Sequence, residues 1–122
     1  AVNTKLHIAA LTNQPSGYAA ALQLLAWTQP LDAIFCASDL IAVGAMKCLK
    51  KHGLHIPQDI LVVGYDNIPI SAFTTPTLTT VQQNTKKAGE LLVSNLLKLI
   101  NNEEVNDYLM PAELIIRQSS QK

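Results

Sequence analysis

Polar side chains follow two short apolar runs of the sequence. Ser38 comes directly after the run at residues 33–37. Asp66 and Asn67 come shortly after the run at residues 60–63. An ionised carboxylate accepts hydrogen bonds and donates none, so Asp66 suits a ligand with adjacent hydroxyl groups. We therefore predict that Asp66 binds a polar small molecule. The alternative is that it merely caps a turn together with Asn67.

Other kinds of site chemistry find no support in the sequence. His52 and His55 flank Gly53, which breaks the helix that would bring them together, so we predict no metal site. No glycine-rich phosphate loop follows a strand, and no serine-nucleophile motif or pair of carboxylates stands out. We predict a protein that is not an enzyme and that needs no cofactor.

A strand–helix–strand unit would position these side chains. Residues 33–37 and 60–63 have the length and apolar character of buried strands. Residues 40–52 between them carry apolar side chains at helical spacing, and Ser38 and Asp39 can cap the helix start. Ligands of open α/β sheets bind beyond the carboxyl ends of the strands, which is where Ser38 and Asp66 fall.

The rest of the chain is also predicted to form alternating strands and helices. We predict strands at residues 5–12, 78–82, 108–110 and 114–117, and helices at residues 18–28 and 84–100. The helix at residues 84–100 carries a stripe of leucines. Because several exposed leucines would form an adhesive patch, we predict that this helix packs on a second copy of the chain or folds back on its own lobe.

Composition narrows the class of protein. The 122 residues suit one compact domain, and 48% of them are hydrophobic, enough for a core. Lys plus Arg balance Asp plus Glu at nine each, which argues against a nucleic-acid-binding surface. Cys36 and Cys48 form no CxxC pair and are predicted to be reduced, apolar residues of an intracellular protein. No run is long enough to span a membrane, and no signal peptide is visible.

Three motifs together resemble one family. SDLIAVGAM, GLHIPQDILVVGYDNIP and TPTLTTVQQ occur in this order, and the sequence from Gly17 to Gln118 resembles the effector domain of LacI/GalR-type bacterial transcription regulators. That domain is related to the type I periplasmic sugar-binding proteins. The resemblance implies an α/β fold with three αβα layers and a mostly parallel, doubly wound sheet, which forms one lobe of a periplasmic-binding-protein-like domain.

The resemblance also implies a domain organisation. Residues 1–83 and 111–122 correspond to the C-terminal lobe of the effector domain, and residues 84–110 correspond to a segment of the N-terminal lobe. The helix-turn-helix domain that binds DNA in the family is absent from this chain.

The family's effector-contacting positions fall on Ser38, Asp66 and Gln83. Thr12 aligns roughly with a position that often carries a sugar-stacking aromatic ring, and Asn13 is an alternative there. A threonine cannot stack, so the alignment slips at Thr12 or the ligand is small. Ser38 could equally be a helix cap, and Gln83 could be an exposed residue at a helix start.

The family's dimer interface falls on two segments. Val43 and Met46 lie in the helix at residues 40–52, and Ile70 and Phe73 lie in the stretch after Asp66. Gly44 would permit close approach of another helix. The alternative is that these apolar residues form ordinary sheet-facing core.

These implications give one functional prediction. We expect the effector-binding and dimerisation region of a cytoplasmic LacI-type repressor that senses a sugar or similar metabolite and binds operator DNA through an N-terminal domain. The alternative is a periplasmic sugar-binding protein of a transport system.

Overall fold

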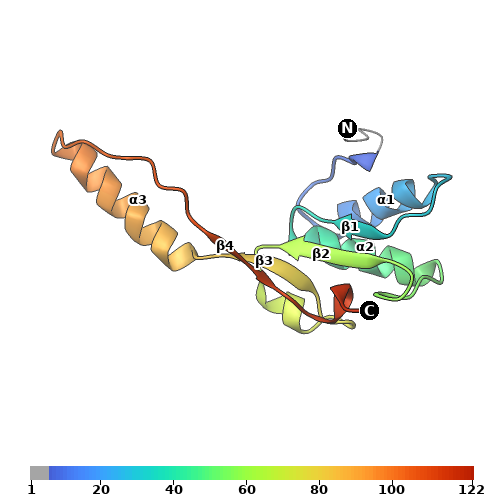
Figure 1. Cartoon of the computed structure of the whole chain (residues 1–122). Helices are drawn as coiled ribbons and strands as arrows, with labels where there is room; N and C mark the ends of the chain where they lie inside the picture. Colours follow the sequence, from blue (N-terminus) through green and yellow to red (C-terminus); the bar gives the residue numbers. More distant parts are fainter. Residues whose placement is uncertain (1–5) are drawn as a thin grey trace.

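The computed structural model describes residues 6–122, which fold around a four-stranded sheet (Figure 1). The elements in chain order are α1 (Gln14–Leu25), β1 (Ala33–Phe35), α2 (Asp39–Lys51), β2 (Leu61–Tyr65), the 3-10 turn η2 (Pro69–Ala72), β3 (Thr79–Gln83), α3 (Thr85–Ile100), β4 (Ala112–Ile115) and the 3-10 turn η3 (Gln118–Ser120). The sheet order is β1-β2-β3-β4. Strands β1 to β3 are parallel, and β4 is antiparallel to β3. The predicted α/β class with a mostly parallel sheet is confirmed.

The predicted strand–helix–strand unit is β1-α2-β2. Helix α2 begins after Ser38, whose Oγ accepts a hydrogen bond from the backbone N–H of Ile41 at 3.3 Å. Lys50 and Lys51 occupy its last turn, where positive charge suits the helix dipole. Gly53 follows with φ +81°, a conformation that costs glycine little. Local signals in the sequence therefore fix both ends of this helix.

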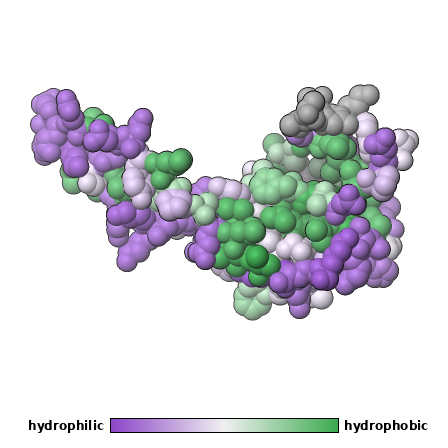
Figure 2. All heavy atoms as spheres, viewed as in Figure 1, coloured by the Kyte–Doolittle hydropathy of each residue, from purple (hydrophilic) through white to green (hydrophobic). Residues whose placement is uncertain are grey.

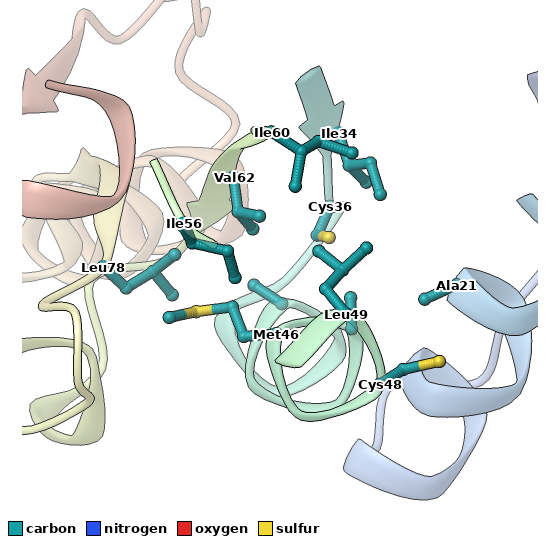
Figure 3. Packing of buried hydrophobic residues seen from close by; sticks show 12 residues of the cluster. Ala21, Ile34, Cys36, Met46, Cys48, Leu49, Ile56, Ile60, Val62 and Leu78 are labelled. Atoms are coloured by element: carbon teal, nitrogen blue, oxygen red, sulfur yellow. The ribbon is translucent and has the colours of Figure 1, made fainter. Parts of the chain in front are cut away.

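The core lies between α2 and one face of the sheet (Figure 3). Leu49 and Met46 of α2 lie opposite side chains from the sheet and its flanking loops, while Cys48 of α2 lies opposite Ala21 of α1. The buried hydrophobic residues are Ala21, Ile34, Cys36, Ala42, Ala45, Met46, Cys48, Leu49, Ile56, Ile60, Val62 and Leu78. Both cysteines are free thiols, and burial raises the pKa of Cys36 to about 12.

Two glycines let α1 and α2 pack closely. A side chain at Gly44 would collide with the backbone of Gln14, and one at Gly17 would collide with the backbone of Ile41. The close approach predicted at Gly44 is therefore made with α1 of the same chain. Substitution at either position would force the two helices apart.

The opposite face of the sheet is apolar and carries no α-helix among residues 6–122. Phe35 is 65% exposed there, and Leu114 and Ile116 are exposed on the same side. Figure 2 shows hydrophobic residues gathered over this face. The predicted three-layer arrangement is thus represented by two layers in the part of the chain that the structure describes.

Two predicted strands are wrong within the described residues. Of the predicted strand at residues 5–12, Lys5 lies outside the described residues, and residues 6–12 form no strand and pair with no neighbour. Leu6, His7, Ile8 and Ala10 instead line an apolar groove together with α1 and β1. Residues 108–110 also form no strand, because the chain reaches β3 only at Ala112, the partner of Gln83. Alternation in sequence therefore does not by itself establish strand pairing, since β1 is an edge strand of the sheet and residues 6–12 still do not pair with it.

Helix α3 projects away from the lobe (Figure 1). It begins at the cap residue Asn84, whose Oδ1 accepts a hydrogen bond from the N–H of Lys87 at 2.9 Å. None of its residues is buried, and Leu92 is 71% exposed. The prediction that α3 folds back on its own lobe is therefore wrong, and its packing on a second copy stays a prediction. No helix within residues 6–122 is both long and apolar enough to cross a membrane.

We expect Leu49→Ala to lower the free energy of unfolding by about 2–5 kcal/mol, because Leu49 is fully buried between α2 and the sheet. Urea denaturation followed by circular dichroism measures this change. Leu109→Ala is the matched control, since Leu109 is 96% exposed and its truncation should change stability by less than about 0.5 kcal/mol. Equal effects of the two variants would contradict the core described above.

Candidate functional site

The candidate site lies at the carboxyl edge of the parallel strands. Ser38 follows β1, Asp66 follows β2, and Gln83 is the last residue of β3. Because the three strands are parallel and adjacent, their carboxyl ends meet at one edge. Polar groups from three separate segments therefore converge there.

Asp66 sits on an unusual turn. Its φ is +100° and that of Asn67 is +50°, so two consecutive residues occupy the left-handed side of φ space. The N–H of Asp66 still donates to the carbonyl of Val81 at 2.9 Å, which ties the start of the turn to β3. The residue is exposed. The turn thus presents the Asp66 carboxylate outward from a fixed backbone.

The amide of Asn67, rather than the Asp66 carboxylate, makes the side-chain hydrogen bonds that hold this turn. Its Nδ2 donates to Oε1 of Gln82 at 2.7 Å, and its Oδ1 accepts from Nη2 of Arg117 at 2.8 Å and from Oγ of Ser71 at 3.2 Å. The alternative role weighed for Asp66, capping the turn, is therefore filled by its neighbour.

Asp39 lies beneath the turn and is completely buried. Its Oδ1 accepts a hydrogen bond from Oγ1 of Thr80 at 2.6 Å, and its Oδ2 accepts one from the N–H of Ile68 at 2.9 Å. Burial raises the pKa of this carboxyl, and the two hydrogen bonds oppose that rise. A side chain at Gly64 would collide with Oδ1, so glycine at 64 leaves the room that Asp39 fills.

Two predicted site residues act as helix caps. Ser38 is buried and caps α2. Asn13 caps α1 through a hydrogen bond from the N–H of Ser16 to its Oδ1 at 2.9 Å. Thr12 is exposed beside it. The first turns of α1 and α2 lie against each other at Gly17, which places Asn13 near the edge where Ser38 lies.

Gln83 lies at the same edge on the apolar face of the sheet. Its Nε2 donates to the hydroxyl of Tyr65 at 2.6 Å. The ring of Tyr65 meets the ring of Phe35 edge-to-face, with centroids 6.5 Å apart and planes at 87°. This aromatic pair is not among the residues predicted from the sequence, although both residues stand at the carboxyl ends of apolar strands.

The predicted dimer residues differ in their exposure to solvent. Phe73 is 82% exposed just after η2, and Ile70 within η2 is also exposed. Val43 is half-buried on α2. Met46 is only 3% exposed and belongs to the core, so its assignment to an interface is corrected. Periodicity on α2 does not distinguish the face toward the sheet from a face toward a partner.

Among residues 6–122, no group of three His, Cys, Asp or Glu side chains is placed to hold a metal ion. His55 instead bonds Asp59, with Nδ1 and Oδ2 3.0 Å apart on the surface. The backbone N–H of His55 also donates to Asp59, and this hydrogen bond is the main reason that the pKa of Asp59 is lowered.

Comparison with known proteins places this arrangement in a family. The sequence profile of the family described as periplasmic binding protein-like domain matches residues 2–120. The HTH-type transcriptional repressor PurR of Escherichia fergusonii is 42% identical over 106 residues, which are 85% of this chain and 31% of the relative. The chain therefore spans about a third of the length of the curated relatives it matches.

Two solved structures extend the similarity to the fold. The complex of the transcriptional regulator CelR with cellobiose superposes with a TM-score of 0.90 at 30% identity, covering 98% of this chain and 37% of that chain. The lac repressor dimer bound to operator and the anti-inducer ONPF superposes with a TM-score of 0.84 at 32% identity, covering 90% of this chain and 39% of that chain. These similar proteins are regulators, and none of the three is named as an enzyme.

We expect Asp39→Asn to change the pH dependence of stability. In the unfolded state the pKa of Asp39 is near 3.8. Because its pKa is raised in the folded state, the folded protein holds the Asp39 proton more tightly than the unfolded chain does. The free energy of unfolding of the parent protein, relative to that of Asp39→Asn, should therefore be greatest below the unfolded-state pKa of Asp39. It should fall as pH rises through the pKa of Asp39 in the folded state. Urea unfolding at several values from about pH 3.5 to pH 8 measures the difference.

Asp59→Asn supplies a control of opposite sign. Because the pKa of Asp59 is lowered, its stabilising effect is present above the unfolded value and is lost as pH falls through the folded pKa. A stability difference for Asp39→Asn that grew with rising pH would contradict the burial of its carboxyl.

Proposed function

This chain belongs to the periplasmic binding protein-like domain family, and from that premise we propose that it is the effector-binding region of a LacI-type transcriptional repressor. It binds a sugar or similar small metabolite and carries out no chemistry on it. A repressor of this type acts in the cytoplasm and binds operator DNA through a domain outside the described residues. The names of its relatives favour this role over that of a transport protein.

The exposed carboxylate of Asp66 is the observation that carries the proposal. It stands on a backbone turn that is tied to β3 and is available to accept hydrogen bonds from adjacent hydroxyls of a ligand. Gln83 lies one strand further along the same edge and offers both a donor and an acceptor. This combination suits a polyol better than an apolar ligand or an anion.

The strands that carry the site also lead to α3. Strand β3 runs into α3 through Asn84 alone, and the chain returns through β4. A ligand that bridges the lobe and the segment containing α3 would therefore change the angle between them. By linkage, effector binding then alters operator affinity, and operator binding alters effector affinity by the same factor.

A thermal-shift screen of the full-length protein tests the proposal. The panel contains cellobiose, pentoses, hexoses, their phosphates and purines. A ligand present at a hundred times its dissociation constant should stabilise the protein by about 2.7 kcal/mol. Asp66→Asn removes the charge while keeping a residue type that tolerates positive φ, and it should abolish the shift.

Asp32→Asn is the matched control for this experiment. Asp32 is an exposed carboxylate directly before β1, at the opposite edge of the sheet, and its loss should leave ligand binding unchanged. A ligand that stabilises Asp66→Asn as much as the parent protein would contradict the assignment of Asp66 as an effector-binding residue. Absence of any hit across the panel would count against a sugar or purine effector.

We further propose that η2 and the residue after it form a surface between two copies of the protein. Phe73→Glu should shift a dimer toward monomer in sedimentation velocity, because it places a charge in an apolar contact. Stability should change little, since Phe73 packs on almost nothing within its own chain. Leu109→Glu is the control, and a dimer that survives Phe73→Glu would contradict the proposed surface.

A further inference from the structure

The turn at Asp66 and Asn67 needs an explanation, because neither residue is glycine. Residues with side chains rarely adopt positive φ, and here two adopt it in succession. Such a backbone persists only where surrounding contacts determine it. The contacts that hold this turn are therefore part of any function that depends on Asp66.

Those contacts come from far along the chain. The N–H of Asn67 donates to Oγ1 of Thr80 at 3.2 Å, and its Nδ2 donates to Gln82 on the same strand. The amide Oδ1 accepts from Ser71 of η2 and, over the shorter distance, from Arg117, which follows β4 and lies 50 residues away in sequence. Strand β3 thus holds one side of the Asn67 amide and Arg117 holds the other.

Arg117 uses the shape of its guanidinium group to join three segments. Nη2 donates to Oδ1 of Asn67 at 2.8 Å, while Nη1 donates to the carbonyl of Leu78 at 2.8 Å and to Oγ of Ser71 at 3.1 Å. The group therefore spans the turn, η2 and the residue that precedes β3. A lysine has one nitrogen at the end of its stem and cannot reproduce this fork.

The backbone of Arg117 is itself held in place. Its N–H donates to Oγ1 of Thr79 at 2.8 Å, and its carbonyl accepts from the same hydroxyl at 2.9 Å. The side chain is half-buried. Arg117 is thus fixed to the start of β3 before its side chain reaches the turn.

We propose that Arg117 is a positioning residue, which holds Asn67 in the left-handed turn and thereby aims the Asp66 carboxylate at the effector. This inference rests on the proposed function for the role of Asp66. Arg117 does not itself touch the ligand. It lies two residues after β4, the strand by which the chain returns from α3, so the geometry of the β3–β4 pair sets the direction of the Asp66 side chain.

Amide hydrogen exchange in the full-length, ligand-free protein tests the anchor directly. In Arg117→Lys, we expect the amides of Asn67 and Ile68 to exchange at least tenfold faster, relative to the core amides of β2, than in the parent protein. Ser119→Ala is the matched control. Ser119 is fully buried and bonds Thr79 and Val62, but it does not touch the turn.

Ser119→Ala should lower the melting temperature without this selective loss of protection. Unchanged exchange at Asn67 and Ile68 in Arg117→Lys would overturn the proposal. If Arg117→Lys does not fold, Arg117→Gln replaces it, because the shorter amide lacks the guanidinium fork that joins Asn67, Ser71 and Leu78. Unchanged exchange at Asn67 and Ile68 in Arg117→Gln would overturn the proposal equally.

The ligand arm uses cellobiose and D-ribose as probes in isothermal titration. If the parent protein binds either sugar, Arg117→Lys should raise the dissociation constant for that sugar at least tenfold, and Ser119→Ala should not. Equal affinities in these two variants would overturn the positioning role. If neither sugar binds while the exchange at Asn67 responds, the anchor stands and the sugar-binding assignment of Asp66 is what fails.

Discussion

The buried carboxylate of Asp39 is the interaction on which the site depends. It joins the first residue of α2 to Thr80 of β3 and to the backbone of Ile68 after β2. A buried acceptor of this kind is costly unless it is hydrogen-bonded, and both of its oxygens are. Because it fits only beside a glycine at position 64, the backbone of β2 is constrained as well. One side chain thus sets the spacing of three elements at the carboxyl edge of the sheet.

Asp39 and Arg117 act on adjacent residues of the same turn. Asp39 accepts a hydrogen bond from the N–H of Ile68, and Arg117 donates to Oδ1 of Asn67, at the end of the amide opposite to the one that bonds β3. Between them they leave Asp66 exposed but mounted on a backbone with little freedom. Such rigidity favours ligand binding, since a carboxylate that is already oriented loses less conformational entropy when the ligand arrives.

Two apolar surfaces of this chain are left uncovered within residues 6–122. Helix α3 buries none of its residues, and the sheet face that carries Phe35 and Leu114 has no helical layer among residues 6–122. Exposed apolar area of this extent is typical of surfaces that pack against another element or another chain. The curated relatives are about three times as long as this chain. The dimer surface proposed at Phe73 is separate from both.

The sequence by itself determined what depends on near neighbours. The cap at Ser38, the stop at Gly53 and the β1-α2-β2 unit all follow from residues within a few positions of one another, and the prediction that Asp66 binds a ligand comes from its place after a buried strand. The tertiary structure decided the rest. It placed Met46 in the core, used Gly44 to pack α2 on α1, left residues 6–12 without a strand partner, and brought Arg117 to Asn67. Those outcomes depend on partners tens of residues away, because hydrogen bonds and packing act through space and leave no period or spacing in the sequence.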